Sequence, residues 1–332
     1  MLRTTRIAGT ELDATRIGLG TWAIGGWMWG GNDEADSIAA VRAAVDRGIT
    51  LIDTAPVYGM GTAEERVGRA LAEGDRRDKV VLATKAGLNW TGRQPYRDAG
   101  PVRIRAEIDE SRRRLRTEVI DVYQVHWPDP TVPVEDTART LRELYEAGTI
   151  RAIGVSNFSP EQMDRFRTEA PLHVVQPPYN IFERGVEADV LPHAARHGLT
   201  SLTYSALCRG LLTGKLRPDS RFEGDDLRKV DPKFREPRYS QYLAAVTALD
   251  ALARERFGTD VLRLAAAWLL HKPGVSVALW GARRPDQLDP VPEIGALQLT
   301  DDDVAEMERL VATHVADPIG PEFMAPPTRE TV

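Results

Sequence analysis

Four polar residues stand where their side chains could carry out acid–base chemistry together. Asp53, Lys85 and His126 each end a short apolar run of the kind that forms a buried strand. Tyr58 follows Asp53 by five residues, so the loop after the first run can fold its phenol back toward the other three side chains. In a parallel barrel the carboxyl ends of the strands open onto one face, which is the catalytic face. The spacing therefore predicts that these residues share one pocket.

The four residue types suit proton transfer to a carbonyl oxygen. A phenol has a pKa of about 10, so Tyr58 needs help to exchange a proton at neutral pH. We expect the Lys85 ammonium to lower the pKa of Tyr58, and Asp53 to hold that amine in place and charged. His126 is expected to hydrogen-bond a substrate oxygen and orient it. This set predicts reduction of an aldehyde or ketone, with hydride supplied by a cofactor.

Lysine usage draws attention to the same place. The chain has six lysines and 37 arginines, and one of these few lysines, Lys85, stands at the end of an apolar strand. Lysine shifts its pKa readily on burial, whereas arginine stays protonated. Taken singly, the four residues have ordinary structural explanations, such as a helix cap, a core ring or a salt-bridge partner. Their joint placement favours catalysis.

Strand-like and helix-like segments alternate along the chain and predict a (β/α)8 TIM barrel, preceded by a β-hairpin at residues 6–14. A doubly wound sheet is the competing architecture. The predicted barrel strands are residues 16–20, 49–53, 80–85, 119–126, 149–155, 172–176, 199–204 and 275–279. The predicted helices are residues 34–47, 63–72, 102–116, 135–147, 160–168, 186–197, 241–257 and 260–271.

One long segment interrupts this alternation. Residues 209–240 are charged, rich in Pro and Gly, and show no period. They follow the seventh strand, on the face predicted to be catalytic, and loops of this length are usually lids or binding loops. We expect a cofactor clamp here, with a plain surface insertion as the alternative. With no internal repeat or low-complexity linker, residues 1–332 are predicted to form a single domain.

The composition narrows the class of partner. Of 332 residues, 42% are hydrophobic and 28% charged, and the net charge of -6 argues against a nucleic-acid partner. The densest basic run, Arg112-Arg113-Arg114, is expected to be a solvated helix face. The start of the chain is too polar for a signal peptide, and no apolar run approaches the roughly 20 residues that span a membrane. A soluble cytoplasmic protein without a membrane partner is predicted.

The single cysteine, Cys208, excludes an internal disulfide and fits a reducing compartment. No histidine or acid near it in the sequence supports a nucleophile. The segment 18–23 matches the dinucleotide fingerprint G-x-G-x-x-G/A, but that fingerprint needs a helix to begin at once. Because a glycine- and tryptophan-rich loop follows instead, a tight turn at the mouth of a barrel is the better interpretation.

Several segments resemble the motifs of the aldo-keto reductases, in the order that the family has them. They are Asp53-Thr54-Ala55-Pro56-Val57-Tyr58-Gly59, Ala83-Thr84-Lys85, Tyr123-Gln124-Val125-His126-Trp127-Pro128, Gly154-Val155-Ser156-Asn157-Phe158, Gln176-Pro177-Pro178-Tyr179-Asn180, Tyr204-Ser205 with Leu207-Cys208-Arg209-Gly210, and Gly281-Ala282-Arg283-Arg284-Pro285-Asp286-Gln287-Leu288. The resemblance runs from about residue 18 to residue 288. The stretch 22–58 and the tail 317–324 are similar to bacterial general stress aldo-keto reductases.

The resemblance implies a role for each matching residue. Tyr58 would be the general acid and base, Asp53 and Lys85 its tuning pair, and His126 the orienting residue. The cofactor would be NADP(H), preferred over NADH because Arg283 and Gln287 would reach the adenosine phosphate, which an arginine fork binds well. The implied cofactor-binding residues are Thr21, Trp22, Asp53, Ser156, Asn157, Gln176, Tyr204, Ser205, Leu207, Arg209, Gly281, Arg283 and Gln287.

Within that set the resemblance divides the work along the cofactor. Ser156, Asn157 and Gln176 would hold the nicotinamide carboxamide, and Tyr204 would stack on the nicotinamide ring. The residues on the pyrophosphate would be Ser205, Leu207 and Arg209. The chain departs from the family at the adenine end: Val291 replaces a frequent asparagine, Ala206 a common proline, and Leu279-Trp280 the usual Ile-Pro. The four catalytic positions carry no departure.

The substrate would be a small carbonyl compound. Trp22, Trp27, Trp90 and Trp127 are expected to wall its pocket, with Trp29 and Trp280 as further candidates. Aromatic walls suit planar and sugar-like carbonyl compounds alike.

Two other functions stay open at this stage. A cofactor-binding regulatory subunit of the same fold would show a large exposed apolar patch. An aldolase-type barrel would use Lys85 to form a Schiff base. No His, Cys or carboxylate cluster has the sequence spacing of metal ligands, so no metal is predicted. Without a heptad or long apolar stripe, a monomer is predicted.

Overall fold

Short apolar runs form the barrel strands, because parallel strands are buried on both faces and need no alternation. In the computed structural model, which describes residues 2–329, eight parallel strands close into a barrel. They are β3 (Ile17–Gly20), β4 (Leu51–Asp53), β5 (Val81–Ala86), β8 (Ile120–Val125), β9 (Ile150–Ser156), β10 (Val174–Gln176), β11 (Thr200–Thr203) and β12 (Val277–Gly281). Pairing of β12 with β3 closes the ring and excludes the doubly wound sheet. The predicted TIM barrel is confirmed.

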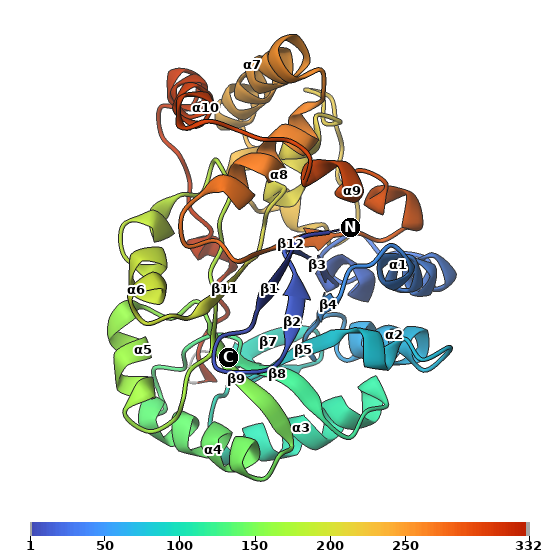
Figure 1. The fold of residues 1–332 in the computed structure, drawn as a ribbon, viewed down its shortest axis with the longest axis vertical. Helices are drawn as coiled ribbons and strands as arrows, with labels where there is room; N and C mark the ends of the chain where they lie inside the picture. The colour runs from blue at the N-terminus through green and yellow to red at the C-terminus, as the bar shows by residue number, and fades with distance from the viewer. Residues whose placement is uncertain (1, 330–332) are drawn as a thin grey trace.

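Amphipathic helices surround the barrel and supply the outer half of the core. They are α1 (Glu34–Asp46), α2 (Thr62–Leu71), α3 (Pro101–Leu115), α4 (Val134–Glu146), α5 (Pro160–Arg167), α6 (Val190–Arg196), α7 (Arg238–Phe257), α8 (Val261–His271), α9 (Val291–Ile294) and α10 (Asp301–His314). In Figure 1, α1 to α6 curve around the barrel, and α7 and α10 lie together at one end of the long axis. Local signals begin several helices: Ser159 caps α5 in a capping box with Gln162.

An N-terminal hairpin covers one end of the barrel. Its strands β1 (Thr4–Arg6) and β2 (Asp13–Thr15) pair antiparallel, so the hairpin begins two residues before its predicted start. Ile7 and Ala14 are fully buried and pack with side chains of the barrel interior. The backbone N–H of Ala8 donates to Thr200 Oγ1 at the start of β11, over 2.8 Å. The hairpin thus seals the amino ends of the strands and leaves the carboxyl ends open.

The structure contains elements that the periodicity did not predict. The strands β6 (Leu88–Thr91) and β7 (Gln94–Arg97) form a second hairpin after β5. The loop from residue 209 contains short 3-10 helices, and α7 begins at Arg238 instead of residue 241. Helix α10 follows a capping box at Thr300. The strands β6 and β7 and the 3-10 helices are short, so apolar spacing gives little signal for them. Helix α10 has Val304, Met307 and Val311 at helical spacing, and the sequence interpretation missed it.

The segment after β3 and the basic run on α3 each form a defined local structure. After β3 the chain forms a 3-10 helix, Trp22–Gly25, and no α-helix, so the dinucleotide fingerprint at residues 18–23 is rightly set aside. The basic run on α3 is only partly a solvated face. Arg114 is largely buried because its Nε donates to the fully buried Glu64 carboxylate over 2.6 Å.

Within residues 2–329, no helix has the length and apolarity needed to cross a membrane.

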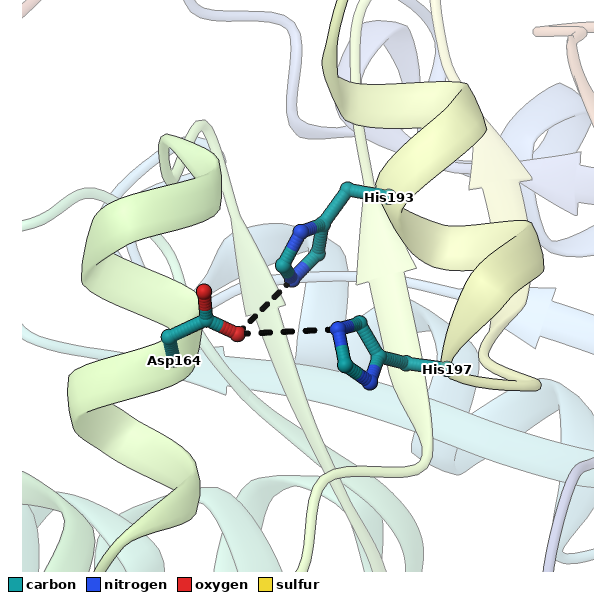
Figure 2. A group of neighbouring side chains, drawn as sticks. All are labelled: Asp164, His193 and His197. Carbon is teal, nitrogen blue, oxygen red and sulfur yellow. Dashed lines mark ion pairs between the residues drawn. The ribbon is translucent and has the colours of Figure 1, made fainter.

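The structure brings together a group of possible metal ligands that the sequence interpretation did not identify. Asp164 on α5, His193 on α6 and His197 at the end of α6 bring three possible ligand atoms within 4.8 Å of one another (Figure 2). His193 and His197 stand four residues apart, a spacing that suits metal ligands on a helix, but Asp164 comes from a different strand–helix unit, so the sequence does not join the three residues. Helix packing around the barrel is what joins them.

Candidate active site

The carboxyl ends of three neighbouring strands bring the predicted catalytic residues together. Asp53 ends β4, Lys85 lies in β5, and His126 follows β8. Lys85 Nζ donates to Asp53 Oδ2 over 2.6 Å, to the Thr54 carbonyl over 2.9 Å and to the Tyr58 hydroxyl over 3.3 Å. The Tyr58 and His126 rings meet edge to face with centroids 5.6 Å apart. All four predicted residues therefore lie in one site.

Asp53 is held from both sides. Its Oδ2 receives the Lys85 amine, and its Oδ1 accepts from Gln176 Nε2 over 2.9 Å and from Gln124 Nε2 over 3.2 Å. Gln124 was not among the predicted site residues. It stands two positions before His126 on β8, which places its side chain on the same face of that strand. A buried carboxylate with this many donors is a fixed partner for the Lys85 amine.

Burial controls the proton affinities of the site. Desolvation, and then the negative charge of Asp53, raise the pKa of Tyr58 well above its usual value. The expectation of a lowered pKa at Tyr58 was wrong, because lost hydration of the phenolate and the charge of Asp53 outweigh the effect of the Lys85 ammonium. Burial also lowers the pKa of Lys85, which Asp53 counteracts. The pKa of His126 falls well below its usual value through burial and the nearby Lys85, so its imidazole is neutral.

A close backbone contact fixes the loop that carries Tyr58. A Cβ atom on Gly25 would lie 2.6 Å from the Tyr58 carbonyl carbon, and one on Gly59 would lie 2.3 Å from the Gly25 oxygen. Only glycines permit this approach at both positions. The Trp22 ring stacks on Tyr58 with centroids 6.0 Å apart. The phenol is thereby held between Trp22 and His126 with its hydroxyl toward Lys85.

Two cavities meet at this point. The larger, of about 370 Å³, extends from the barrel mouth toward η7 (Pro285–Leu288), and the smaller measures about 220 Å³. Both are lined by the same four residues, Trp22, Tyr58, Gln176 and Tyr204. The predicted cofactor residues on the larger cavity are Thr21, Trp22, Asp53, Gln176, Tyr204, Ser205, Leu207, Arg209, Gly281, Arg283 and Gln287. Ser156 and Asn157 line the smaller one.

The smaller cavity is largely apolar and aromatic. Trp22, Trp27 and Trp127, three of the tryptophans predicted to wall the substrate pocket, line this cavity. Trp90 is not among its lining residues, because its ring lies against the guanidinium of Arg103 at 5.5 Å. Trp90 packs instead against the cluster that contains Val57 and Leu88, and its role in a substrate pocket stays a prediction. The chain's tail contributes Phe323, Met324 and Pro326, which the sequence interpretation did not include.

Polar residues at the junction of the cavities are already bonded to one another. Asn157 Nδ2 donates to the His126 carbonyl and to Ser156 Oγ, each over 3.0 Å, and its Oδ1 accepts from the Tyr204 hydroxyl over 2.8 Å. Ser156 Oγ donates to the Gln176 carbonyl over 2.8 Å. The predicted carboxamide-binding residues thus form one connected group beside Tyr58. Asn157 would have to exchange a protein partner to bind a ligand.

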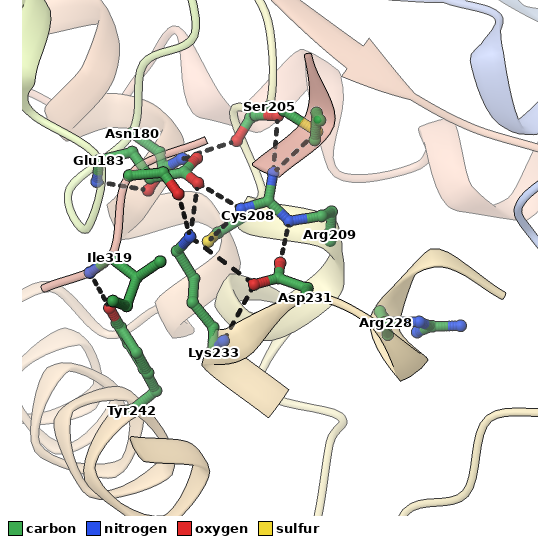
Figure 3. Close-up of polar contacts among 12 residues, drawn as sticks. Asn180, Glu183, Ser205, Cys208, Arg209, Arg228, Asp231, Lys233, Tyr242 and Ile319 are labelled. Carbon is green, nitrogen blue, oxygen red and sulfur yellow. Dashed lines mark hydrogen bonds and ion pairs between the residues drawn. The ribbon is translucent and has the colours of Figure 1, made fainter. Parts of the chain in front are cut away.

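The loop after β11 is fixed by a buried charge network (Figure 3). Arg209 donates to Asp231 Oδ2 over 2.6 Å and also contacts Glu183, whose carboxylate accepts from the fully buried Lys233 over 2.8 Å. Arg209 Nη1 reaches Ser205 Oγ at 3.2 Å. Ser205, Cys208, Arg209 and Gly210 all have positive φ, so the loop turns sharply next to the larger cavity. Arg209 was predicted to contact pyrophosphate, but here carboxylates occupy much of its hydrogen-bonding capacity.

Cationic side chains gather on the larger cavity. Arg283 lines it together with Lys215 and Arg228, which the sequence interpretation missed. Burial and the nearby charges of Arg228 and Arg284 lower the pKa of Arg283. Gln287 Oε1 accepts from the backbone N–H of Arg283 over 2.7 Å, so it shapes this turn. Arg228 is paired with Asp226 over 2.6 Å, whereas Arg283 has no ion pair within residues 2–329, so Arg283 is the cation that suits an anionic ligand.

The larger cavity has a further feature that fits a nicotinamide dinucleotide. The indole N–H groups of Trp22 and Trp29 are buried and lack a hydrogen-bond partner among residues 2–329, and both rings line this cavity. Buried donors without partners cost free energy unless a ligand accepts from them. The cationic residues complete the fit, since such a ligand carries phosphates. Within the described chain, Lys85 lines neither cavity.

Comparisons with known proteins agree with this architecture. The model described as "Aldo/keto reductase family" matches residues 16–312. The chain is 57% identical over 328 residues to Aldo-keto reductase YhdN of Bacillus subtilis (strain 168), with 99% of each chain covered. It is 33% identical over 316 residues to the NADH-specific methylglyoxal reductase of Escherichia coli (strain K12), covering 91% of this chain and 96% of the relative.

A solved structure shares the fold at high identity. The glycerol dehydrogenase AKR11B4 from Gluconobacter oxydans has a TM-score of 0.88 and 51% sequence identity, covering 97% of this chain and 99% of that chain. The match of the family model over nearly the whole chain, the sequence relatives and the shared barrel all lead to one assignment. The protein belongs to the aldo/keto reductase family.

Proposed function

We propose that this protein reduces aldehydes and ketones to alcohols with NADPH, reversibly, with Tyr58 as the general acid and base. Family membership supports carbonyl reduction in general. The observation that carries the finer proposal is the position of the Tyr58 hydroxyl. It lies 3.3 Å from Lys85 Nζ, and its residue lines both cavities where they meet. A substrate in the smaller cavity would have this proton donor beside it.

The side chains divide the proton chemistry among them. The residues of the larger cavity would hold a nicotinamide dinucleotide, which would supply the hydride for the carbonyl carbon. Tyr58 keeps its proton until a carbonyl oxygen develops negative charge, because its pKa is raised well above the usual value. The neutral His126 donates a hydrogen bond to the same oxygen. Lys85, held by Asp53, stabilises the phenolate that remains. In the oxidative direction the same groups act in reverse.

NADPH is proposed over NADH because of the charge on the larger cavity. Lys215 and Arg283 line it together with Arg228, which Asp226 already binds. Arg283 makes its side-chain hydrogen bonds only to the carbonyls of Trp29 and Gly31 within the described chain. A guanidinium bound to neutral carbonyls remains available to a phosphate. Because the relative from Escherichia coli is NADH-specific, the affinities of this protein for NADPH and for NADH have to be measured side by side.

The substitution Tyr58→Phe tests the catalytic role. We expect turnover of an aldehyde to fall by about 10²- to 10⁴-fold, because the phenol is the proton donor. Binding of NADPH, followed by tryptophan fluorescence quenching, should stay unchanged. Tyr96→Phe, on the outer hairpin, is the matched control and should keep full activity. Equal turnover in Tyr58→Phe and the wild type would refute the assignment.

The pair Arg283→Gln and Arg284→Gln tests the cofactor preference. Arg284 neighbours Arg283 but pairs with Asp286 over 3.1 Å and does not line the cavity. We expect Arg283→Gln to raise the Kd for NADPH about tenfold or more, because a charge-assisted phosphate contact is lost. The Kd for NADH should barely change, and Arg284→Gln should leave both values as they are. Equal affinities of the wild type for the two cofactors would contradict the preference.

The two other functions find less support. The exposed large hydrophobic side chains of residues 2–329 are Val102 and Val230, from different elements, and do not form the patch expected of a regulatory subunit. A Schiff-base role would need Lys85 to reach a substrate, yet its amine lies behind Asp53 and Tyr58. Borohydride trapping with a carbonyl substrate should therefore yield no adduct at Lys85.

We also propose that the protein works as a monomer in the cytoplasm.

A further inference from the structure

Two outer helices of the barrel present three metal-binding side chains to one another. His193 and His197 stand four residues apart, so they lie on one face of α6, and Asp164 faces them from α5. Figure 2 shows both imidazoles directed at the same carboxylate. His193 Nε2 lies 3.2 Å from Asp164 Oδ1, and His197 Nε2 lies 3.7 Å from the same oxygen.

We propose that Asp164, His193 and His197, here called the α5–α6 cluster, bind one divalent transition-metal ion of the zinc class. Zinc bonds of roughly 2.0–2.2 Å to imidazole nitrogen and carboxylate oxygen imply donor atoms about 3.4 Å apart around a tetrahedral ion. The two separations measured here, 3.2 and 3.7 Å, lie on either side of that value. Small side-chain movements would therefore complete the three-ligand geometry, with water in the fourth position.

The donor set selects the class of metal. Two imidazoles and one carboxylate suit zinc and its neighbours in the first transition series. Magnesium and calcium prefer sites made of oxygen ligands, and only one of these three residues offers oxygen.

One ligand atom of the cluster, His193 Nε2, makes no hydrogen bond within residues 2–329. The side chain of His193 is 3% exposed, and Asp164 is near. A buried ring nitrogen without a hydrogen bond is costly. A metal ion at the cluster would give this nitrogen the bond that the protein does not provide, which independently indicates a ligand at this place.

A neighbouring arginine competes with the ion. Arg167 Nη1 lies 2.5 Å from His197 Nδ1. Because a guanidinium can only donate, Nδ1 must accept, and the ring proton is then on Nε2. Metal binding through Nε2 moves that proton to Nδ1, where Arg167 can no longer donate. Arg167 must therefore swing into solvent, which its partly exposed side chain permits.

The position of the cluster indicates a structural effect. His197 is the C-cap of α6 and lies shortly before β11 begins at Thr200, so the cluster lies toward the amino ends of the strands. That is the face opposite the cavities, where a barrel protein usually gains stability and not catalysis. A bound ion would tie α5 to α6 and raise the melting temperature by mass action.

The test uses the full chain, stripped with a chelator and titrated with Co²⁺ and with Zn²⁺. We expect one ion per chain, visible absorption bands of tetrahedral Co²⁺, and a higher melting temperature with Zn²⁺. Asp164→Asn and His197→Gln change exposed side chains and should fold normally. Each should raise the Kd for Zn²⁺ about tenfold or more, since each removes one of three ligands.

Two more variants separate the cluster from chance binding at surface histidines. Arg167→Gln removes the competing guanidinium and should lower the Kd for Zn²⁺. A change of charge at a distant surface position should have no such effect. His271→Gln removes an equally exposed histidine that faces the single carboxylate of Asp301 over 3.0 Å, and should leave the Kd unchanged. The proposal is overturned if the wild type binds no ion, or if His271→Gln weakens binding as much as His197→Gln. An unchanged Kd for Zn²⁺ in Arg167→Gln would show that Arg167 does not compete with the ion for His197.

Discussion

At the scale of single residues, burial decides the chemistry of this site more than residue type does. The sequence predicted which four side chains would meet, because each stands at or just after the end of an apolar strand. It did not predict the direction of the pKa shift at Tyr58, because the loss of hydration depends on the rings and loops packed around the phenol. The same loss of hydration acts on carboxylates that are not part of the cavities.

Glu107 on α3 is such a carboxylate. It is 1% exposed, accepts from the Gly87 N–H over 2.9 Å and pairs with Arg103 over 3.0 Å. Burial, the largest cause, raises the pKa of Glu107 to about 7. A raised pKa means that the folded chain binds the extra proton between about pH 4.5 and pH 7, so stability is greatest below this range and declines as pH rises through it.

Glu107→Gln should remove that decline. Relative to the wild type, the variant should gain about 2–3 kcal/mol in free energy of unfolding between pH 5 and pH 8, since other titrating groups contribute equally to both proteins. Urea unfolding at the two pH values measures the difference. If the difference in free energy of unfolding between the variant and the wild type is the same at pH 5 and pH 8, Glu107 does not titrate between these pH values.

At the scale of elements, the sequence predicted the barrel because period and caps are local signals. Buried strands show as apolar runs, and helices such as α5 start at a Ser-Pro pair with its capping glutamine. What it missed depends on contacts between distant segments. Phe323 and Met324 reach the smaller cavity only because the tail returns to it, where the Arg97 N–H donates to the Pro327 carbonyl over 2.9 Å.

One contact between elements gives a sharp prediction. A Cβ on Gly68 of α2 would lie 2.3 Å from the Arg114 oxygen at the end of α3. Gly68→Ala should therefore push α2 from α3 and lower the free energy of unfolding by about 1–3 kcal/mol. Gly295→Ala is the control: its φ is -68° and a Cβ there meets nothing within 4 Å, so stability should hold or rise slightly. Similar losses in the two variants would argue against this steric account.

At the scale of the whole molecule, the two ends of the barrel have separate tasks. The β1–β2 hairpin seals the amino ends, and the α5–α6 cluster lies toward that side. At the carboxyl ends, the tail and the loop after β11 surround the cavities. The sequence predicted this polarity from strand direction alone, since all catalytic positions end or follow a strand. It could not predict the buried network of Arg209, whose partners come from separate loops.

The scarcity of lysine makes the loop after β11 unusually easy to observe by chemical labelling. Lys85 and Lys233 are fully buried, and Lys272 is 15% exposed beside Glu308. The three exposed lysines are Lys79, Lys215 and Lys229, and the last two belong to this loop. An acylating reagent would therefore mark mainly the loop. If it clamps the cofactor, Lys215 should acylate several-fold more slowly once NADPH is added, while Lys79 serves as an internal reference in the same mass spectrum.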